Sequence, residues 1–358
     1  MAKKRKTLPK DFAEILKRGD TEEIIAVFDK CELDAYGGYG RHTALGFTEC
    51  PPEFDKWIVG QGLDMEAVND YGYTALQHRA EYRTANIRSL LELGAKVDTN
   101  NKNGTALHCA AKSNVVEHVK TLLQHGAEVD ALAPEPFSYG AEQATSTPLE
   151  YSLTFCRNID IVNTVETAKI LMAAGAQNTE KMKGLVTKIG IQFEHHRPGF
   201  NKDSVQQYSD ALSELYKLFD IPPVPSRELH DGKSEITVKA GDWKKQFNEL
   251  WELLIPSSGA AQTMQGEVIR IAGRISDELA RNGGINWDDD YKVMADTFLD
   301  FIQQGEPLSP GEINQASEII KEVKRKNDNN TDRLAELAVK WIAGNPTPVR
   351  TPAVKYDR

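Results

Sequence analysis

Apolar residues recur every three or four positions along most of this chain, which is the spacing of one face of an α-helix. In residues 8–178 the apolar stripes are short and come in pairs, with glycine-containing turns between them. The first pair lies within residues 8–35, where Phe12 belongs to one stripe and Ile24 to the next. This pattern predicts short helices that pair in sequence and leave each pair with an apolar face that only a neighbouring pair can cover.

Longer apolar stripes follow in the second half. The prolines between residues 222 and 225 end the helical pattern of residues 179–220, because proline lacks the amide donor and restricts the residue before it. Ser309 and Glu312 have the spacing of a capping box, so a helix is expected to begin there. The helices expected in this half cover residues 243–254, 268–279, 291–302, 310–323 and 334–342.

A motif repeats in the N-terminal half. Residues 103–108 read Asn-Gly-Thr-Ala-Leu-His, and residues 126–130 read Gly-Ala-Glu-Val-Asp. A second copy has Tyr-Thr-Ala-Leu-Gln at 73–77 and Gly-Ala-Lys-Val-Asp at 94–98, so the two copies are 31 positions apart at their threonines and 32 at their glycines. The threonine caps the first helix of each pair, and the glycine supplies the left-handed residue that ends the second.

This motif resembles the ankyrin repeat, whose signature is Thr-Pro-Leu-His-x-Ala followed by Leu-Leu-x-x-Gly-Ala. The resemblance implies stacked helix pairs that bind other proteins, with a divergent first copy serving as an N-terminal cap. The copies lie at residues 8–35, 40–66, 72–99, 103–130 and 145–178.

We therefore predict an all-α protein in which an ankyrin-repeat solenoid of about five repeats precedes an α-helical C-terminal domain. The tail is rich in proline and is expected to be disordered. The expected divisions are a repeat domain at 1–178, a helical connector with a Pro-rich, polar linker at 179–241, a helical domain at 242–344, and the tail at 345–358.

The last repeat is longer than the others. Residues 133–146 are inserted before its first helix, and residues 158–165 lengthen the region between its two helices. Insertions in solenoids fall on loops of one face, often the face that binds a partner. A neutral extension of the loop is the alternative, so contact between residues 133–146 and a partner is left open.

The resemblance also places a binding surface. Ankyrin arrays bind proteins through a concave face made by the loop tips and the exposed side of each first helix. Several expected tips carry tyrosine, which gives a large contact area at low entropic cost. The alternative is that these rings pack on neighbouring loops. The predicted partner-binding residues are Tyr36, Tyr39, Arg41, Tyr71, Tyr73, Gln77, Arg79, Lys102, Phe137 and Tyr139.

Sequence motifs for catalysis are absent: there is no phosphate-binding loop, zinc-protease helix or nucleophile elbow. His195, His196 and the aspartates 288–290 are the best metal candidates, but adjacent histidines point to different sides of a helix, and aspartates suit a helix start. Glu267 and Arg270 have the spacing of a helical ion pair. We expect a non-enzymatic protein with no catalytic residue, metal or cofactor. The alternative is an enzyme, including a metal-dependent one, with its site in the C-terminal helical half.

Charge and composition narrow the partners. Asp and Glu outnumber Lys and Arg by 53 to 43, and the net charge of −10 disfavours nucleic acid. No apolar stretch approaches the roughly 18 residues that a membrane helix needs. The four cysteines include no Cys-x-x-Cys pair, which suits free thiols in a reducing compartment. We expect a cytoplasmic protein whose partner is another protein, with the C-terminal domain as the candidate for homo-oligomerisation.

One further resemblance concerns origin. Residues 265–274 and 283–288 resemble sequences of uncharacterised bacterial proteins, which implies no activity and only a bacterial or phage origin. In that setting, the binding protein expected here would be an inhibitor, an immunity factor or an anti-defence factor.

Overall fold

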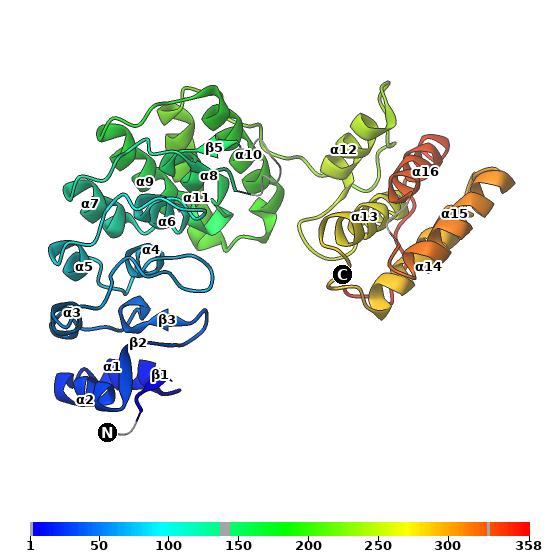
Figure 1. Cartoon of the computed structure of the whole chain (residues 1–358). Helices are drawn as coiled ribbons and strands as arrows, with labels where there is room; N and C mark the ends of the chain where they lie inside the picture. The colour runs from blue at the N-terminus through cyan, green and yellow to red at the C-terminus, as the bar shows by residue number, and fades with distance from the viewer. Residues whose placement is uncertain (1–2, 137–143, 328–329) are drawn as a thin grey trace. The chain divides into compact units, whose positions relative to one another are not determined.

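The computed structural model describes residues 3–136, 144–327 and 330–358 (Figure 1). Within these ranges, every helix is too short or too polar to cross a bilayer. The chain divides into two compact units. Unit 1 comprises Met1–Gln192 and Asn201–Val224, and unit 2 comprises Phe193–Phe200 and Pro225–Arg358.

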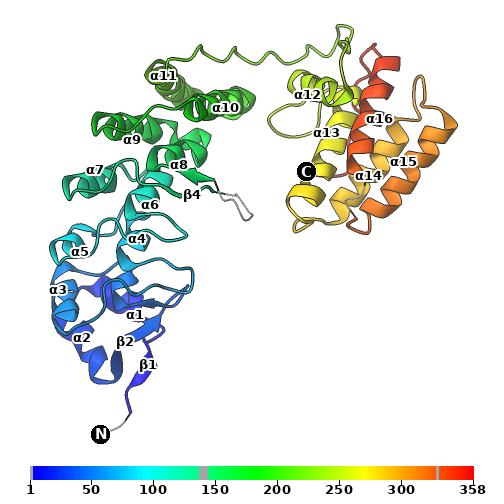
Figure 2. The ribbon, with the colours of Figure 1, turned by 45° about the horizontal axis from the view of Figure 1, so that its top comes forward.

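Unit 1 is mostly helical. Its helices are α1 (Phe12–Arg18), α2 (Thr21–Ala26), α3 (Pro52–Gly60), α4 (Ala75–Ala80), α5 (Arg88–Glu92), α6 (Ala106–Lys112), α7 (Val116–Gln124), α8 (Pro148–Thr154), α9 (Ile161–Ala173), α10 (Glu180–His196) and α11 (Lys202–Leu218). The last four residues of α10 belong to unit 2. Helices α3, α5, α7 and α9 lie in successive layers along one side, and α4, α6 and α8 lie beside them (Figures 1 and 2). We call α4, α6 and α8 the inner helices.

Each inner helix begins at a threonine. Thr74, Thr105 and Thr147 have extended backbones, and each side chain accepts a hydrogen bond from the backbone N–H three residues further on. That bond satisfies one of the amide groups that a helix start leaves without a partner. The helix starts predicted from these threonines are confirmed.

The third residue of each inner helix has a second task. In α4, the side-chain oxygen of Gln77 accepts from the backbone N–H of Thr74 at 2.9 Å. The amide nitrogen of the same side chain donates to the carbonyl groups of Thr99 (3.1 Å) and Gly104 (2.6 Å). Gln77 therefore joins the start of its own helix to the loop of the next layer.

The corresponding residues of α6 and α8 are His108 and Glu150. His108 accepts from the backbone N–H of Thr105 through Nδ1 at 3.1 Å, and its Nε2 lies 3.1 Å from the carbonyl oxygen of Ser146. Burial lowers the pKa of His108 to about 4, so the ring is neutral at pH 7 and Nε2 carries the proton donated to Ser146. The Glu150 carboxylate accepts a hydrogen bond from the backbone N–H of Thr147 at 3.2 Å and another from the ammonium group of Lys181 at 3.3 Å.

The N-terminal layers contain strands that the all-α prediction missed. Strand β1 (Arg5–Thr7) pairs in parallel with β2 (Cys31–Gly37), and β2 pairs antiparallel with β3 (His42–Thr43). Residues 31–37 contain no β-branched side chain, so their pairing rather than their intrinsic propensity makes them a strand. The expected first helix of the repeat at 40–66 is reduced to the 3₁₀ turn Ala44–Gly46.

The two ends of the insertion at residues 133–146 are short strands that pair with each other. Strand β4 (Ala133–Pro134) pairs antiparallel with β5 (Thr145–Ser146). The hydroxyl group of Tyr151 on α8 donates to the carbonyl group of Pro134, which fixes the base of the hairpin to the last repeat.

Two further helices extend unit 1 beyond the repeats. Helix α11 packs against α9, and the side chains of Val186 on α10 and Leu215 on α11 are completely buried. The two units therefore divide between residues 192 and 225, whereas the sequence placed the divisions at 178 and 241.

Unit 2 is helical. Its helices are α12 (Trp243–Leu254), α13 (Met264–Ser276), α14 (Asp289–Phe301), α15 (Pro310–Val323) and α16 (Thr331–Gly344), as the apolar stripes predicted. Helix α13 is central, because it packs against α12, α14 and α16. A Cβ atom at Gly273 would lie 2.3 Å from the ring of Trp251, so glycine allows α12 to approach α13 closely.

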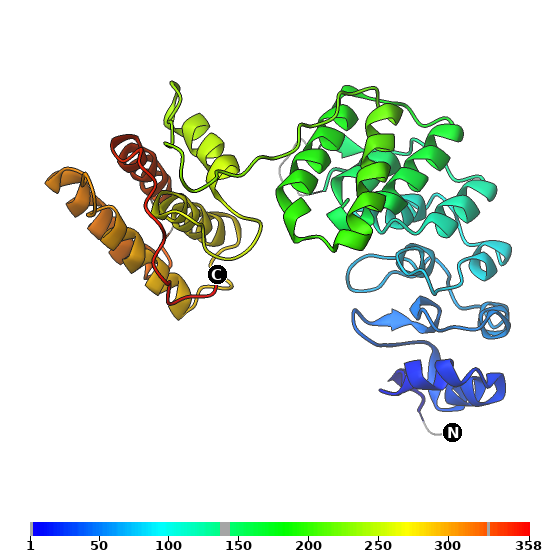
Figure 3. The same cartoon turned by 180° about the vertical axis from the view of Figure 1, so that it is seen from behind.

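The expectation of disorder for residues 345–358 is wrong. This segment, red in Figure 3, leaves α16 and runs back along unit 2. The backbone N–H of Met264 donates to the carbonyl group of Val349 at 2.7 Å, and Tyr356 is only 8% exposed. Backbone hydrogen bonds and one buried ring hold the segment in place. Neither feature can be predicted from its proline-rich composition.

We predict that His108→Gln preserves stability at pH 7 and removes a loss of stability in acid. Gln77 already performs the same task in α4, so glutamine suits the position. The folded ring resists protonation down to about pH 4, whereas the unfolded ring protonates near pH 6.5. Its contribution is therefore complete above about pH 6.5 and decreases as the pH falls, by roughly 2 kcal/mol at pH 4.5.

Urea unfolding of the wild type and the variant at pH 7 and pH 4.5, followed by circular dichroism, measures this difference. The variant should lose less stability than the wild type between the two pH values. An equal loss in both proteins would show that His108 does not carry the acid sensitivity.

Candidate protein-binding surface

The loop tips of unit 1 are built on asparagine turns. The side-chain oxygen of Asn69 accepts from the backbone N–H groups of Tyr71 (3.0 Å) and Tyr73 (2.9 Å). The same turn recurs one layer on, where Asn101 accepts from the N–H group of Asn103 at 2.9 Å. The described tips lie at residues 36–42, 69–73 and 101–104.

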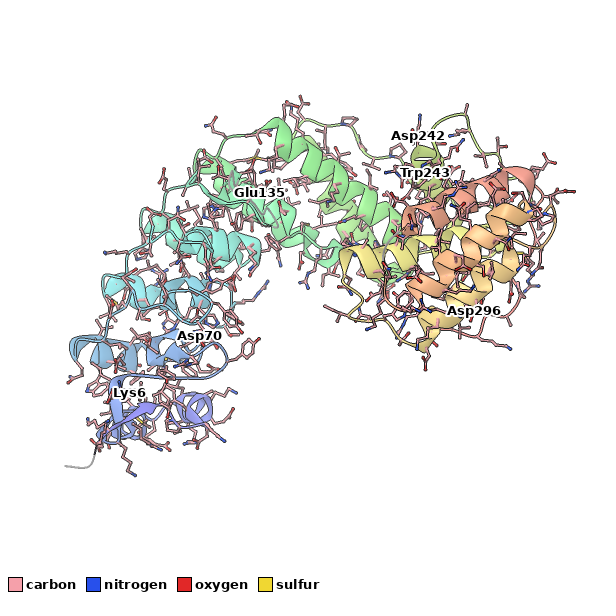
Figure 4. The ribbon with its side chains drawn as sticks, turned by 45° about the vertical axis from the view of Figure 1, so that its right-hand side comes forward. Lys6, Asp70, Glu135, Asp242, Trp243 and Asp296 are labelled. Atoms are coloured by element: carbon pink, nitrogen blue, oxygen red, sulfur yellow. The ribbon has the colours of Figure 1, made fainter. Side chains whose placement is uncertain are left out.

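Successive tips are also bonded to each other. The backbone N–H of Asp70, which Figure 4 labels, donates to the carbonyl group of Gly40 at 2.9 Å. The side-chain amide of Asn103 donates to the carbonyl group of Tyr71 at 3.1 Å. The tips therefore hold fixed positions relative to one another, and their side chains are presented by an ordered backbone.

Five of the predicted binding residues lie on the first two tips: Tyr36, Tyr39, Arg41, Tyr71 and Tyr73. The rings of Tyr39 and Tyr71 have centroids 5.7 Å apart, and they are 87% and 45% exposed. The guanidinium group of Arg41 lies 3.9 Å from the ring centroid of Tyr36. A Cβ atom at Gly40 would lie 2.8 Å from the Tyr71 ring, so glycine permits this contact. Tyr39 and Tyr71 thus pack against each other across neighbouring tips, which is the alternative considered from the sequence, and both still present exposed surface.

An aromatic stripe continues from these tips along α4, and sequence reasoning missed it. The rings of His42 and His78 have centroids 4.0 Å apart, and those of His78 and Tyr82 are 4.9 Å apart. Tyr73, a predicted residue, lies 6.4 Å from His78. The signal was the four-residue spacing of His78 on α4 and Tyr82 just after the end of that helix, which is the spacing of neighbours on one side of a helical turn.

The stripe carries little charge at neutral pH. Burial, helped by the neighbouring His78, lowers the pKa of His42 to about 4, and burial also lowers the pKa of His78. Further along, the ammonium group of Lys112 lies 3.1 Å from the Glu81 carboxylate and 5.3 Å from the ring centroid of Phe155. We call the three tips and this stripe together the tip face.

The prediction that Gln77 and Arg79 contact a partner is wrong. Gln77 is 1% exposed because it bridges two layers, and Arg79 is completely buried. The Arg79 guanidinium group donates two hydrogen bonds of 2.8 Å to the carboxylate of Asp55 and one of 3.0 Å to the carbonyl group of Asn86. The hydroxyl group of Ser89 also donates to Asp55, at 2.5 Å.

Three predicted binding residues remain: Lys102, Phe137 and Tyr139. Lys102 is exposed on the third tip, so it remains a candidate contact. Phe137 and Tyr139 lie outside the described residues, and their predicted role stays a prediction.

The metal candidates considered from the sequence do not come together. His195 Nδ1 lies 3.8 Å from a carboxylate oxygen of Glu252, next to the ring of His196. Asp288 caps α14 by accepting from the backbone N–H of Tyr291 at 3.3 Å, which is the helix-start role predicted for it. In the described part of the chain, no three His, Cys, Asp or Glu side chains are grouped to hold a metal ion.

Residues 48–133 match the family model of ankyrin repeats, in three copies. The N-terminal half of the chain therefore contains ankyrin repeats, as the resemblance predicted. The matched segment includes the tips at 69–73 and 101–104. No curated protein matches the chain. Ankyrin repeats generally mediate protein binding, which makes the tip face the candidate surface for it.

We predict that Arg79→Ala lowers the free energy of unfolding of unit 1 by about 3–5 kcal/mol, because it leaves the buried carboxylate of Asp55 without its cation. Replacing both partners with apolar residues, as in Arg79→Met with Asp55→Leu, should recover most of that loss. Urea unfolding at pH 7 measures both effects. A loss below about 1 kcal/mol for Arg79→Ala would contradict the buried pair, since exposed pairs have values in that range.

Proposed function

We propose that this chain is a non-enzymatic binding protein that docks another protein on the tip face of a five-repeat ankyrin solenoid in the cytoplasm. The observation that carries the proposal is the exposed pair of Tyr39 and Tyr71 on tips that are hydrogen-bonded to each other. Binding through side chains that are already held in place loses little conformational entropy. Tyrosine also offers a large apolar area with a polar end, which is typical of residues that dominate interfaces.

The electrostatics of the tip face support a protein partner. His42 and His78 are uncharged at neutral pH, and Lys112 is paired with Glu81. Arg41 and Lys102 are exposed cations on the tips, and Arg41 lies 3.9 Å from the Asp70 carboxylate. A nucleic-acid backbone would require a concentration of positive charge. The chain as a whole has a net charge of −10.

The alternative of an enzyme rests on ionisable residues buried in unit 2. Glu267 and Arg270 are the best example, and both are buried. Their side chains bind each other, and Glu267 also accepts from Tyr356, so the pair is engaged within the fold. We therefore favour binding over catalysis. A protein that only binds acts by covering a surface of its partner, so we propose an inhibitor, immunity or anti-defence role in a bacterium or phage.

We predict that alanine at both Tyr39 and Tyr71 weakens partner binding at least tenfold, which is about 1.4 kcal/mol. The unfolding free energy should change by no more than about 1 kcal/mol, because Tyr39 is 87% exposed and Tyr71 is 45% exposed. The partner is first captured on the tagged full chain from a lysate of the native host and identified by mass spectrometry. Its affinity for each variant is then measured by calorimetric titration.

Ile191→Ala provides the matched control, since Ile191 on α10 is 46% exposed, close to the 45% of Tyr71. This control should bind the partner as the wild type does. The proposal fails if the double tyrosine variant binds with wild-type affinity, or if binding is lost only together with folding.

A further inference from the structure

Residues 345–358, which we call the attached strand, bind unit 2 through backbone hydrogen bonds and one isolated β-bridge. The backbone N–H of Met264 donates to the carbonyl group of Val349 at 2.7 Å, and the N–H of Thr351 donates to the carbonyl group of Gln262 at 3.0 Å. Thr263 and Arg350, which lie between these bonds, form an antiparallel bridge. The bridge is isolated, and together with the two backbone bonds it pairs residues 349–351 with the segment that precedes α13, which is the kind of backbone pairing used in recognition of extended peptides.

A buried glutamine holds the first part of the strand. Gln265 on α13 is completely buried, and its side-chain nitrogen donates to the carbonyl groups of Asn345 (3.0 Å) and Thr347 (2.7 Å). Its side-chain oxygen accepts from the backbone N–H of Val349 at 3.1 Å. All three bonds go to backbone atoms of the strand, so this residue recognises an extended chain irrespective of its side chains.

A tyrosine anchors the far end of the strand. The hydroxyl group of Tyr356 donates to the Glu267 carboxylate at 2.5 Å. Arg270 makes two hydrogen bonds to the same carboxylate, at 2.9 and 2.7 Å, and a third to the backbone carbonyl group of Arg358. Glu267 and Arg270 are 0% and 1% exposed, so Tyr356 covers an ion pair that would otherwise face water.

The strand buries very little of itself. In the segment 345–358, Tyr356 is the only residue in the buried class, Val354 packs partly against the apolar core, and Val349 is 47% exposed although its backbone is bonded on both sides. A cover that served stability alone would bury apolar side chains, because a buried ion pair seldom stabilises more than apolar packing of the same volume. Backbone bonds with one aromatic anchor are instead the way a domain recognises a short peptide.

We propose that this surface of α13 is a binding site for an extended peptide that carries a tyrosine seven positions after the residue paired with Met264, and that residues 345–358 occupy the site in cis. A peptide of a partner competes for the same backbone bonds and for the Glu267–Arg270 anchor. Segments held by few buried contacts open at low free-energy cost, so the strand is able to exchange.

The test uses a fluorescein-labelled synthetic peptide of residues 345–358 and the full chain, with fluorescence anisotropy as the readout. The attached strand competes at an effective concentration on the order of millimolar, so the wild type should bind the peptide weakly. Tyr356→Ala removes the anchor of the attached strand and leaves the site intact. This variant should bind the peptide at least tenfold more tightly than the wild type.

Two controls keep the result interpretable. Val349→Pro removes the backbone N–H group that donates a hydrogen bond to the side-chain oxygen of Gln265. Val349 is exposed and lies outside the core, so this variant should also bind the peptide more tightly than the wild type. A peptide carrying Tyr356→Phe should bind the Tyr356→Ala chain at least threefold more weakly than the unaltered peptide, because it lacks the hydroxyl group that Glu267 accepts.

The proposal is overturned if neither chain variant binds the peptide more tightly than the wild type while circular dichroism shows both folded. It is also overturned if both variants unfold, because residues 345–358 would then be a structural element of the core. Equal affinity for the tyrosine and phenylalanine peptides would overturn the assignment of tyrosine as the anchor.

Discussion

In the three layers that have an inner helix, the third residue of that helix ties the stack together. Gln77, His108 and Glu150 differ in chemistry, yet each accepts a hydrogen bond from the backbone N–H of the threonine that begins its helix. Gln77 and His108 also bond the loop of the next layer. Apolar faces alone would allow layers to slide, whereas buried hydrogen bonds of fixed length require one register, because breaking them leaves polar groups buried without partners.

The order of the binding surface follows from that register. The loop that receives the bond from Gln77 contains the third tip, so the same contact that joins two layers also fixes the distance between two tips. Asn69 and Asn101 then fix the shape of each tip from within. A surface organised in this way is ordered before a partner arrives, and its exposed rings do not have to be immobilised at the moment of binding.

The sequence predicts the parts of this structure that depend on local chemistry. Threonine caps and apolar spacing place α4, α6, α8 and the helices of unit 2 correctly, although the helix expected after Thr43 is only a 3₁₀ turn. Prediction from the sequence fails where a residue distant in the chain determines whether a side chain is buried. Arg79 is charged and lies on a short helix, so an exposed position is expected for it, yet it forms a buried ion pair with Asp55 from the previous layer. The prediction that Gln77 contacts a partner is wrong, although Gln77 occupies the same position in its repeat as His108. Comparing the two copies indicates that both side chains join neighbouring layers. Tyr39 and Tyr71 are in contact because tip residues of successive repeats are neighbours, and Arg41 lies over Tyr36 within a single tip.

The claim at the centre of this account is that the tip face is where the partner binds. Hydrogen–deuterium exchange of the full chain, with and without the captured partner, tests it most directly. The account predicts slower exchange at residues 69–73 and 101–104 in the complex, with helices α12 to α16 unchanged. Slower exchange confined to residues 242–358 would contradict it and would assign partner binding to unit 2.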